Sequence, residues 1–85
     1  MKILYFAAIR SRLGVAEEEI ALPSGVTTVG ELLRWQRARG PAYAEAFRDN
    51  QVVRVAVNEE YAGPEQHVAQ GDEIAFFPPV TGGSP

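Results

Sequence analysis

The segment from Lys2 to Ile9 limits the possible folds most, because it is apolar on both faces of a predicted strand. From Ile3 onward it holds only aromatic and aliphatic residues, with no glycine or proline. Successive side chains of a strand point to opposite faces, so such a segment needs cover on its faces and a neighbour at each edge. In a chain of 85 residues, which forms one domain with a modest core, this predicts a central strand of a sheet.

One main helix is predicted later in the chain. Thr28 and Glu31 have the spacing of a capping box, in which the threonine accepts a bond from the Glu31 amide and Glu31 reaches back. Gly40-Pro41 ends this helix, and Pro41 opens a shorter one. One face of the main helix then carries Val29, Leu32, Leu33 and Gln36.

The remaining segments predict short strands joined by turns. The predicted turns are Arg10 to Ala16, Asn58-Glu59-Glu60 and Gln70-Gly71-Asp72, and the predicted strands are Glu18 to Leu22, Val52 to Val57 and Glu73 to Phe77. This order predicts an α+β fold, a mixed sheet with one main helix packed across one face. The crossover through the helix allows the first and last strands to lie parallel at the sheet centre.

Pro78-Pro79 ends the last strand, because proline lacks the amide donor that a sheet needs. We therefore predict a domain over residues 1–77 and a flexible C-terminal tail over residues 78–85. The prolines favour a stiff extended chain, and Gly82-Gly83 have no side chains. From Pro78 to Gly83 such a chain spans about 20 Å, which suits insertion into a narrow channel of another protein.

The composition excludes several classes of function. The net charge of -3 and the pI of about 5.0 argue against nucleic acid and anionic membranes as partners. The absence of cysteine excludes disulfides, thiolate metal sites and persulfide chemistry on a side chain. No metal site is predicted, because the single histidine, His67, has no second ligand near it in sequence. No apolar run spans a bilayer and no signal-peptide pattern opens the chain, which predicts a cytoplasmic protein.

The run from Phe76 to Gly83, Phe-Phe-Pro-Pro-Val-Thr-Gly-Gly, is the most specific motif of the chain. It resembles the C-terminus of the small subunit of molybdopterin synthase, the MoaD family. Further likeness lies in the Lys2 to Arg10 segment, the helix start at Thr28, Val55 to Asn58, and Gly71 to Phe77. The resemblance implies the ubiquitin-like β-grasp fold, which agrees with the element order above.

The resemblance also implies a sulfur carrier that is no enzyme by itself and binds no cofactor. The Gly83 carboxylate is adenylated by an ATP-using enzyme related to ubiquitin activators, and a sulfur donor then converts it to a thiocarboxylate. The tail enters the large subunit of the synthase, with which the carrier forms a heterotetramer. There it donates sulfur to cyclic pyranopterin monophosphate, two carriers serving each dithiolene of molybdopterin. Gly82 beside it keeps the tail narrow.

The chain departs from this family at its end, where Ser84-Pro85 follow the second glycine. Gly83 therefore carries a peptide carbonyl and not the free carboxylate that adenylation requires. We expect Ser84-Pro85 to be absent from the active form. A clipped precursor, a remnant of cloning and a carrier-dead variant are the three explanations.

A docking surface is predicted on the sheet face opposite the helix. If Ile74 and Phe76 face the helix, Phe77 faces away, and Phe6 and Tyr61 fall on the same side. A cluster of exposed aromatic residues on one sheet face indicates a surface that binds a partner. The alternative is that loops half-bury these residues. With the tail, the predicted partner-binding residues are Phe6, Tyr61, Phe77, Pro78, Pro79, Val80 and Thr81.

The charged residues are interpreted as solvated. This applies to Arg34, Arg37 and Arg39 on the helix flank, and to the glutamates Glu17-Glu18-Glu19 and Glu59-Glu60, which could also steer a basic partner. Other functions remain open on the sequence: a β-grasp sulfur carrier for thiamine or tRNA thiolation, a ubiquitin-like protein modifier, or a binding module without carrier activity.

Overall fold

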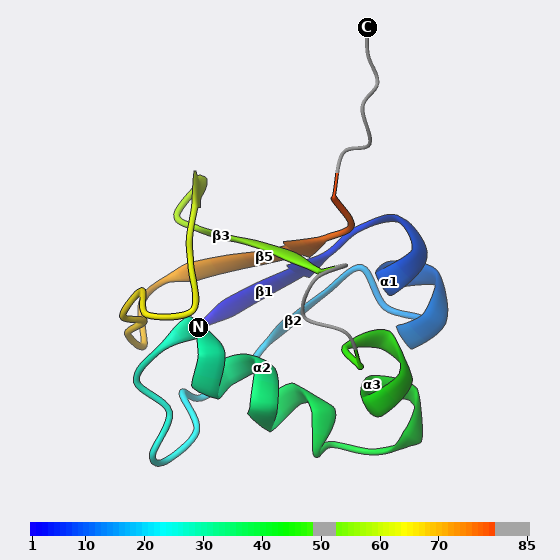
Figure 1. Cartoon of the computed structure of the whole chain (residues 1–85), viewed down its shortest axis with the longest axis horizontal. Helices are drawn as coiled ribbons and strands as arrows, with labels where there is room; N and C mark the ends of the chain where they lie inside the picture. The colour runs from blue at the N-terminus through cyan, green and yellow to red at the C-terminus, as the bar shows by residue number, and fades with distance from the viewer. Residues whose placement is uncertain (49–52, 80–85) are drawn as a thin grey trace, which may run out of the picture.

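The computed structural model describes residues 1–48 and 53–79. Their five strands form one sheet in the order β2-β1-β5-β3-β4, with α2 and α3 on one side of it and α1 beyond the end of β1 (Figure 1). Strands β1 and β5 pair in parallel, and the other neighbours pair antiparallel. The predicted α+β fold with a parallel central pair is therefore confirmed. The elements are β1 (Lys2–Tyr5), α1 (Ala7–Leu13), β2 (Glu17–Glu19), α2 (Val29–Arg37), α3 (Pro41–Ala46), β3 (Arg54–Val57), β4 (Glu60–Tyr61) and β5 (Glu73–Phe77).

The core lies between the sheet and helices α2 and α3. The inward residues of the central strands are buried, among them Ile3 of β1 and Ile74 of β5. Three aromatic rings meet beside them, Tyr5, Phe47 and Phe76, with centroids 5.0–6.3 Å apart. Such ring pairs contribute roughly 0.5–1.5 kcal/mol beyond the area that they bury. The core is thus built from the central strands and one helical face, as the sequence predicts.

The first turn of α2 is closed by its own cap and by a distant loop. The Thr28 hydroxyl accepts from the Glu31 amide at 3.2 Å, and the Glu31 carboxylate accepts from the Thr28 amide at 3.2 Å, which confirms the capping box. The Gly30 amide donates to the Pro64 carbonyl at 3.0 Å. The helix start therefore holds the segment after β4 against α2, a contact on which the site described below depends.

The predicted first strand is wrong beyond Tyr5, and the turn predicted from Arg10 to Ala16 is confirmed only from Gly14 to Ala16. The chain forms α1 instead, in which Ile9 is buried. Alanine, arginine and leucine favour a helix here, and Gly14, in the left-handed region with φ 80°, ends it. The sequence stays apolar beyond Tyr5 because α1 also packs on the core, and not because the strand continues.

Two further strands differ from the predictions. Strand β2 covers Glu17–Glu19 and not Glu18 to Leu22, although it pairs with β1 as expected. Glu60 belongs to β4 and not to the turn, which consists of Asn58 and Glu59. The third strand begins at Arg54 within the described residues, and the predicted start at Val52 lies outside them.

Replacing Glu59 with glycine is expected to stabilise the fold. Asn58 and Glu59 have φ values of 51° and 72° and link Val57 to Glu60, the geometry of a two-residue hairpin turn that favours asparagine followed by glycine. Relief of the left-handed conformation outweighs the greater freedom of glycine in the unfolded chain, for a net gain of about 0.5–1 kcal/mol. Urea unfolding should show a higher midpoint for Glu59→Gly. The control Glu60→Gly, in β4, should lower it, and a lower midpoint for both variants would contradict the turn assignment.

Candidate functional site

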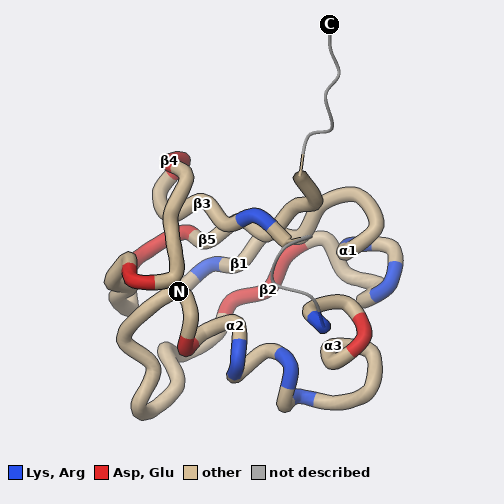
Figure 2. Tube along the Cα trace, in the orientation of Figure 1, with Lys and Arg blue, Asp and Glu red and all other residues tan. Residues whose placement is uncertain are grey.

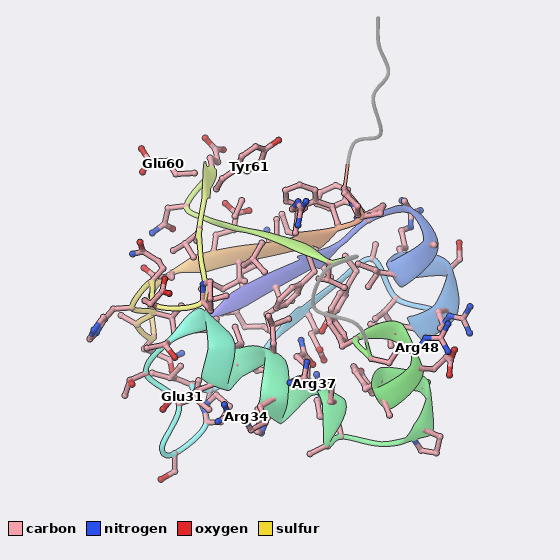
Figure 3. All side chains as sticks on the ribbon, viewed as in Figure 1. Glu31, Arg34, Arg37, Arg48, Glu60 and Tyr61 are labelled. Carbon is pink, nitrogen blue, oxygen red and sulfur yellow. The ribbon has the colours of Figure 1, made fainter. Side chains whose placement is uncertain are left out.

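The face of the sheet opposite α2 carries an exposed aromatic cluster. Tyr61 pairs across from Ala56, and Phe77 pairs across from Arg54. The Tyr61 and Phe77 rings lie 5.7 Å apart, and Figure 3 shows Tyr61 on the side of the sheet away from α2. We call this surface the open face and define it by Leu4, Phe6, Arg54, Tyr61, Ala75 and Phe77.

Phe6 joins the open face at the end of β1. Its amide donates to the Phe76 carbonyl at 3.1 Å, and its backbone is still extended, so the alternation of β1 places its ring on the side of Leu4. Phe6 is 45% exposed and Tyr61 is 79% exposed. The predicted placement of the three aromatic residues is confirmed, and cover of Tyr61 by a loop is not what the structure shows. Their role in binding a partner stays a prediction.

The tail residues are only partly described. Pro78 and Pro79 follow β5 directly and are half-buried. The predicted site residues Val80, Thr81, Gly82 and Gly83, and the Ser84-Pro85 end, lie outside the described residues. Pro78 and Pro79, which we call the root of the tail, therefore lie beside Phe77 at the edge of the open face.

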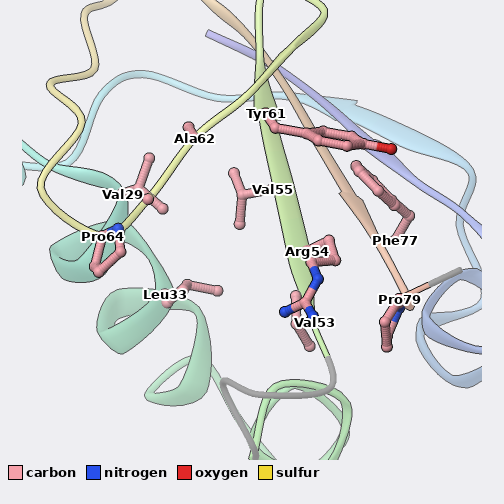
Figure 4. A pocket seen from close by; sticks show the side chains of 11 residues that line it. Val29, Leu33, Val53, Arg54, Val55, Tyr61, Ala62, Pro64, Phe77 and Pro79 are labelled. Atoms are coloured by element: carbon pink, nitrogen blue, oxygen red, sulfur yellow. The ribbon is translucent and has the colours of Figure 1, made fainter.

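A groove of about 710 Å³ lies along β3 and was not predicted from the sequence. It runs from the aromatic residues of the open face to the first turns of α2 (Figure 4). The one charged residue of its lining, Arg54, stands in an otherwise apolar run of β3, and this was the only local signal for it. The lining residues are Val29, Leu33, Val53, Arg54, Val55, Tyr61, Ala62, Gly63, Pro64, Phe77 and Pro79.

A polar network on the helix side of the sheet links β2 to α2 and to Arg39 just after it. Figure 2 shows acidic residues on β2 and basic residues along α2. The Arg39 guanidinium donates two bonds to the Glu18 carboxylate, at 2.6 and 3.1 Å, and a third to the Gln36 side chain at 3.0 Å. Gln36, fully buried, donates to the Tyr5 hydroxyl at 3.0 Å, and that hydroxyl donates to Glu18. The prediction that Arg39 and Glu18 are solvated is therefore wrong, because each finds its partner on a distant element.

The environment of Arg39 and Glu18 fixes their charges. The guanidinium of Arg39 lies over the rings of Trp35 and Tyr43, at 4.6 and 4.2 Å from their centroids. The hydrogen bonds that Glu18 accepts from Arg39, and to a smaller extent from Tyr5, hold the pKa of Glu18 below its ordinary value, although burial acts in the opposite direction. Burial foremost, then the bond to Glu18, raises the pKa of Tyr5. The network is a structural link between β1, β2 and α2.

The Glu18 carboxylate is expected to contribute stability at neutral pH that is lost in acid. Since its pKa is lowered in the folded state, the contribution is complete above the ordinary value of 4.5 and disappears as pH falls through the lowered pKa. Glu18→Gln should cost roughly 1–3 kcal/mol at pH 7 and flatten the acid limb of the unfolding free energy. Urea unfolding between about pH 3 and pH 7, from the acidic range in which glutamate titrates to neutral pH, measures this. Glu17→Gln, on an exposed neighbour, is the control, and an unchanged acid limb in Glu18→Gln would refute the assignment.

The described residues hold no group of three His, Cys, Asp or Glu side chains arranged to bind a metal ion. His67 is exposed. None of the helices in this part of the chain is long and apolar enough to cross a membrane. The features that stand out in the described structure are the open face, the groove beside it and the root of the tail.

Fold and sequence together place the chain among the ubiquitin-like β-grasp proteins, and it belongs to the ThiS family, whose model matches residues 3–83. A relative from Escherichia coli, the molybdopterin synthase sulfur carrier subunit, is 36% identical over 83 residues, with 98% of this chain and 99% of that protein covered. The resemblance drawn from the tail motif is thereby confirmed.

Two of the solved structures that resemble this fold are informative for its function. A Pyrococcus furiosus protein described as a candidate molybdopterin converting factor, subunit 1, has a TM-score of 0.73 and 34% identity, with 93% of this chain and 95% of that chain covered. The small archaeal modifier protein 1 of Haloferax volcanii has a TM-score of 0.66 and 27% identity, with 94% and 97% covered.

Proposed function

We propose that this chain is the sulfur-carrying small subunit of a molybdopterin synthase. The observation that carries the proposal is the Phe-Phe-Pro-Pro-Val-Thr-Gly-Gly motif, whose two phenylalanines end β5 and whose Phe77 belongs to the open face. The full-length likeness to the Escherichia coli sulfur carrier subunit supports it. The chain then acts as a carrier and not as an enzyme alone, and it binds no cofactor itself.

The carrier chemistry takes place on the main chain. After removal of Ser84-Pro85, the Gly83 carboxylate attacks the α-phosphate of ATP on an activating enzyme, which forms an acyl-adenylate and releases pyrophosphate. Hydrosulfide released by the donor then attacks the carbonyl carbon, so that a carbon–sulfur bond forms as the carbon–oxygen bond to AMP breaks, and the thiocarboxylate remains on Gly83. Glycine suits both steps, because its carbonyl carbon is unhindered and its backbone adopts whichever φ the partner's channel requires.

The large synthase subunit is the proposed receiver of the tail, in a heterotetramer of two carriers and two large subunits. The open face docks on it, and the tail enters its active site. There the thiocarboxylate sulfur is transferred to cyclic pyranopterin monophosphate, and two carriers complete one dithiolene. The exposed Phe6 and Tyr61 and the half-buried Phe77 provide the apolar anchors that such an interface needs.

Phe77→Ala is expected to weaken the complex with the large subunit while the fold remains intact. Phe77 lies between Tyr61 and the root of the tail, so its removal should cost about 1–3 kcal/mol of binding free energy. Isothermal titration calorimetry with the large subunit measures the change. Val15→Ala is the matched control, because Val15 is 41% exposed but lies outside the open face. Equal affinities for the wild type and a folded Phe77→Ala protein would rule out the docking surface.

A protein modifier is the second candidate function, favoured by the likeness to the Haloferax volcanii modifier protein. It would use the same activated Gly83 but transfer the acyl group to lysine amines and not sulfur to a pterin. The two functions differ in their products. Isopeptide-linked Gly83 on cellular proteins would favour the modifier, and a thiocarboxylate consumed by a synthase would favour the carrier. A carrier for thiamine or tRNA thiolation would form the thiocarboxylate but fail to bind the large subunit.

A further inference from the structure

Strand β3 has an open edge over its first half. Strand β4 pairs with it only at Ala56↔Tyr61 and Val57↔Glu60. The Ala62 amide still donates to the Val55 carbonyl at 2.9 Å, but the Val55 amide makes no return bond to the Ala62 carbonyl. The chain then leaves for the start of α2. Among the described residues, no strand pairs with β3 on this side between residues 53 and 55.

The groove lies at this open edge and has a wall on each side of the sheet. On the helix side the wall is aliphatic and includes Val29, Leu33 and Val55. On the open face it consists of Tyr61, Phe77 and Arg54 (Figure 4). A volume of about 710 Å³ is enough to hold several side chains of a bound segment.

Arg54 gives the groove a positive charge on one side only. It is exposed, and it forms no ion pair or hydrogen bond with its side chain among the described residues. Every other residue of the lining is uncharged. A guanidinium in this position favours a carboxylate on the segment that lies opposite it.

We propose that this groove binds an extended peptide segment with alternating aliphatic and acidic residues, added as a strand to the edge of β3. The peptide backbone would accept from the free Val55 amide. Residues opposite Val55 would point to the aliphatic wall near Leu33, and the residue opposite Arg54 would point to the open face and pair with its charge. This docking mode goes beyond the carrier function and does not depend on it.

Titration of the full, nitrogen-15-labelled chain with a short peptide tests the proposal. The probe is acetyl-Val-Glu-Val-Glu-Val-amide, and its charge-reversed control is acetyl-Val-Lys-Val-Lys-Val-amide. We expect the acidic probe to shift the amide signals of Leu33, Val53 and Val55 and to slow hydrogen exchange at Val55. We expect it to bind about tenfold more tightly than the lysine peptide, since attraction to Arg54 is replaced by repulsion.

Arg54→Glu separates this mode from non-specific apolar binding. The variant should reverse the preference between the two peptides, whereas Arg34→Glu, on an exposed position of α2 outside the groove, should leave it unchanged. The proposal is overturned if neither peptide binds at millimolar concentration, if the shifts fall outside the groove, or if Arg54→Glu keeps the wild-type preference. None of these results bears on thiocarboxylate formation at Gly83, so the carrier function is tested separately.

Discussion

A chain that ends at Gly83 is expected to gain one sulfur in place of one oxygen, whereas a chain that ends at Pro85 is expected to gain none. Each would be given ATP, an activating enzyme and its sulfur donor. Adenylation needs a free carboxylate on the residue that carries the sulfur, and Ser84-Pro85 move that carboxylate to proline. Proline fixes φ and places a ring at the reacting residue, whereas glycine adopts any φ.

Intact-mass measurement of the two chains reads out this difference directly. The chains share residues 1–83, so the open face and the groove are the same in both, and only the terminus differs. The Gly83-ended chain without ATP is the control. If the full chain also gains sulfur with Ser84-Pro85 still attached, our account of the terminus is wrong.

Local signals in the sequence were sufficient for part of the fold. The bounds of β5, Glu73–Phe77, follow from the turn before it and the two prolines after it. The start of α2 follows from the spacing of Thr28 and Glu31, which are near enough in sequence to satisfy each other. Each of these features is determined by residues within a few positions of it.

Features that depend on distant residues were not predictable in this way. A short apolar run suits a buried strand or one face of a helix equally well, and Ile9 is buried in α1 as it would be in a strand. Arg39 appeared solvated because its partner, Glu18, lies 21 residues away on another element. Charge pairs of this kind have no sequence signature, so they become visible only when the fold brings the elements together.

The candidate site also has a part that local sequence signals predict and a part that depends on distant residues. Alternation along β5 and the neighbouring strands was enough to place Phe6, Tyr61 and Phe77 on one face. The groove was missed, because it exists only where β4 stops after two residues and the Gly30 amide holds Pro64 against α2. Where the pairing of β3 with β4 ends depends on the tertiary structure. Arg54 becomes part of a groove only because the pairing ends there.

Gly82→Val is expected to abolish sulfur transfer without a change in folding. The described core is complete without any residue after Phe76, so the free energy of unfolding should change by less than about 0.5 kcal/mol. The steric cost arises in the channel of the large subunit, where a β-branched side chain widens a tail that has none at Gly82 and Gly83. Thermal unfolding and molybdopterin formation in a reconstituted synthase measure the two effects separately.

Gly71→Val is the matched control for this substitution. A side chain built on Gly71 meets no atom within 4 Å, and its φ is not in the left-handed region, so the variant should fold and still transfer sulfur. Thiocarboxylate formation on each variant is measured by intact mass before the large subunit is added, which shows at which step Gly82→Val fails. Because the proposed channel lies in the large subunit, we expect the loss to fall mainly on transfer. A Gly82→Val chain that supports molybdopterin formation at the wild-type rate would show that the channel does not require a tail without side chains.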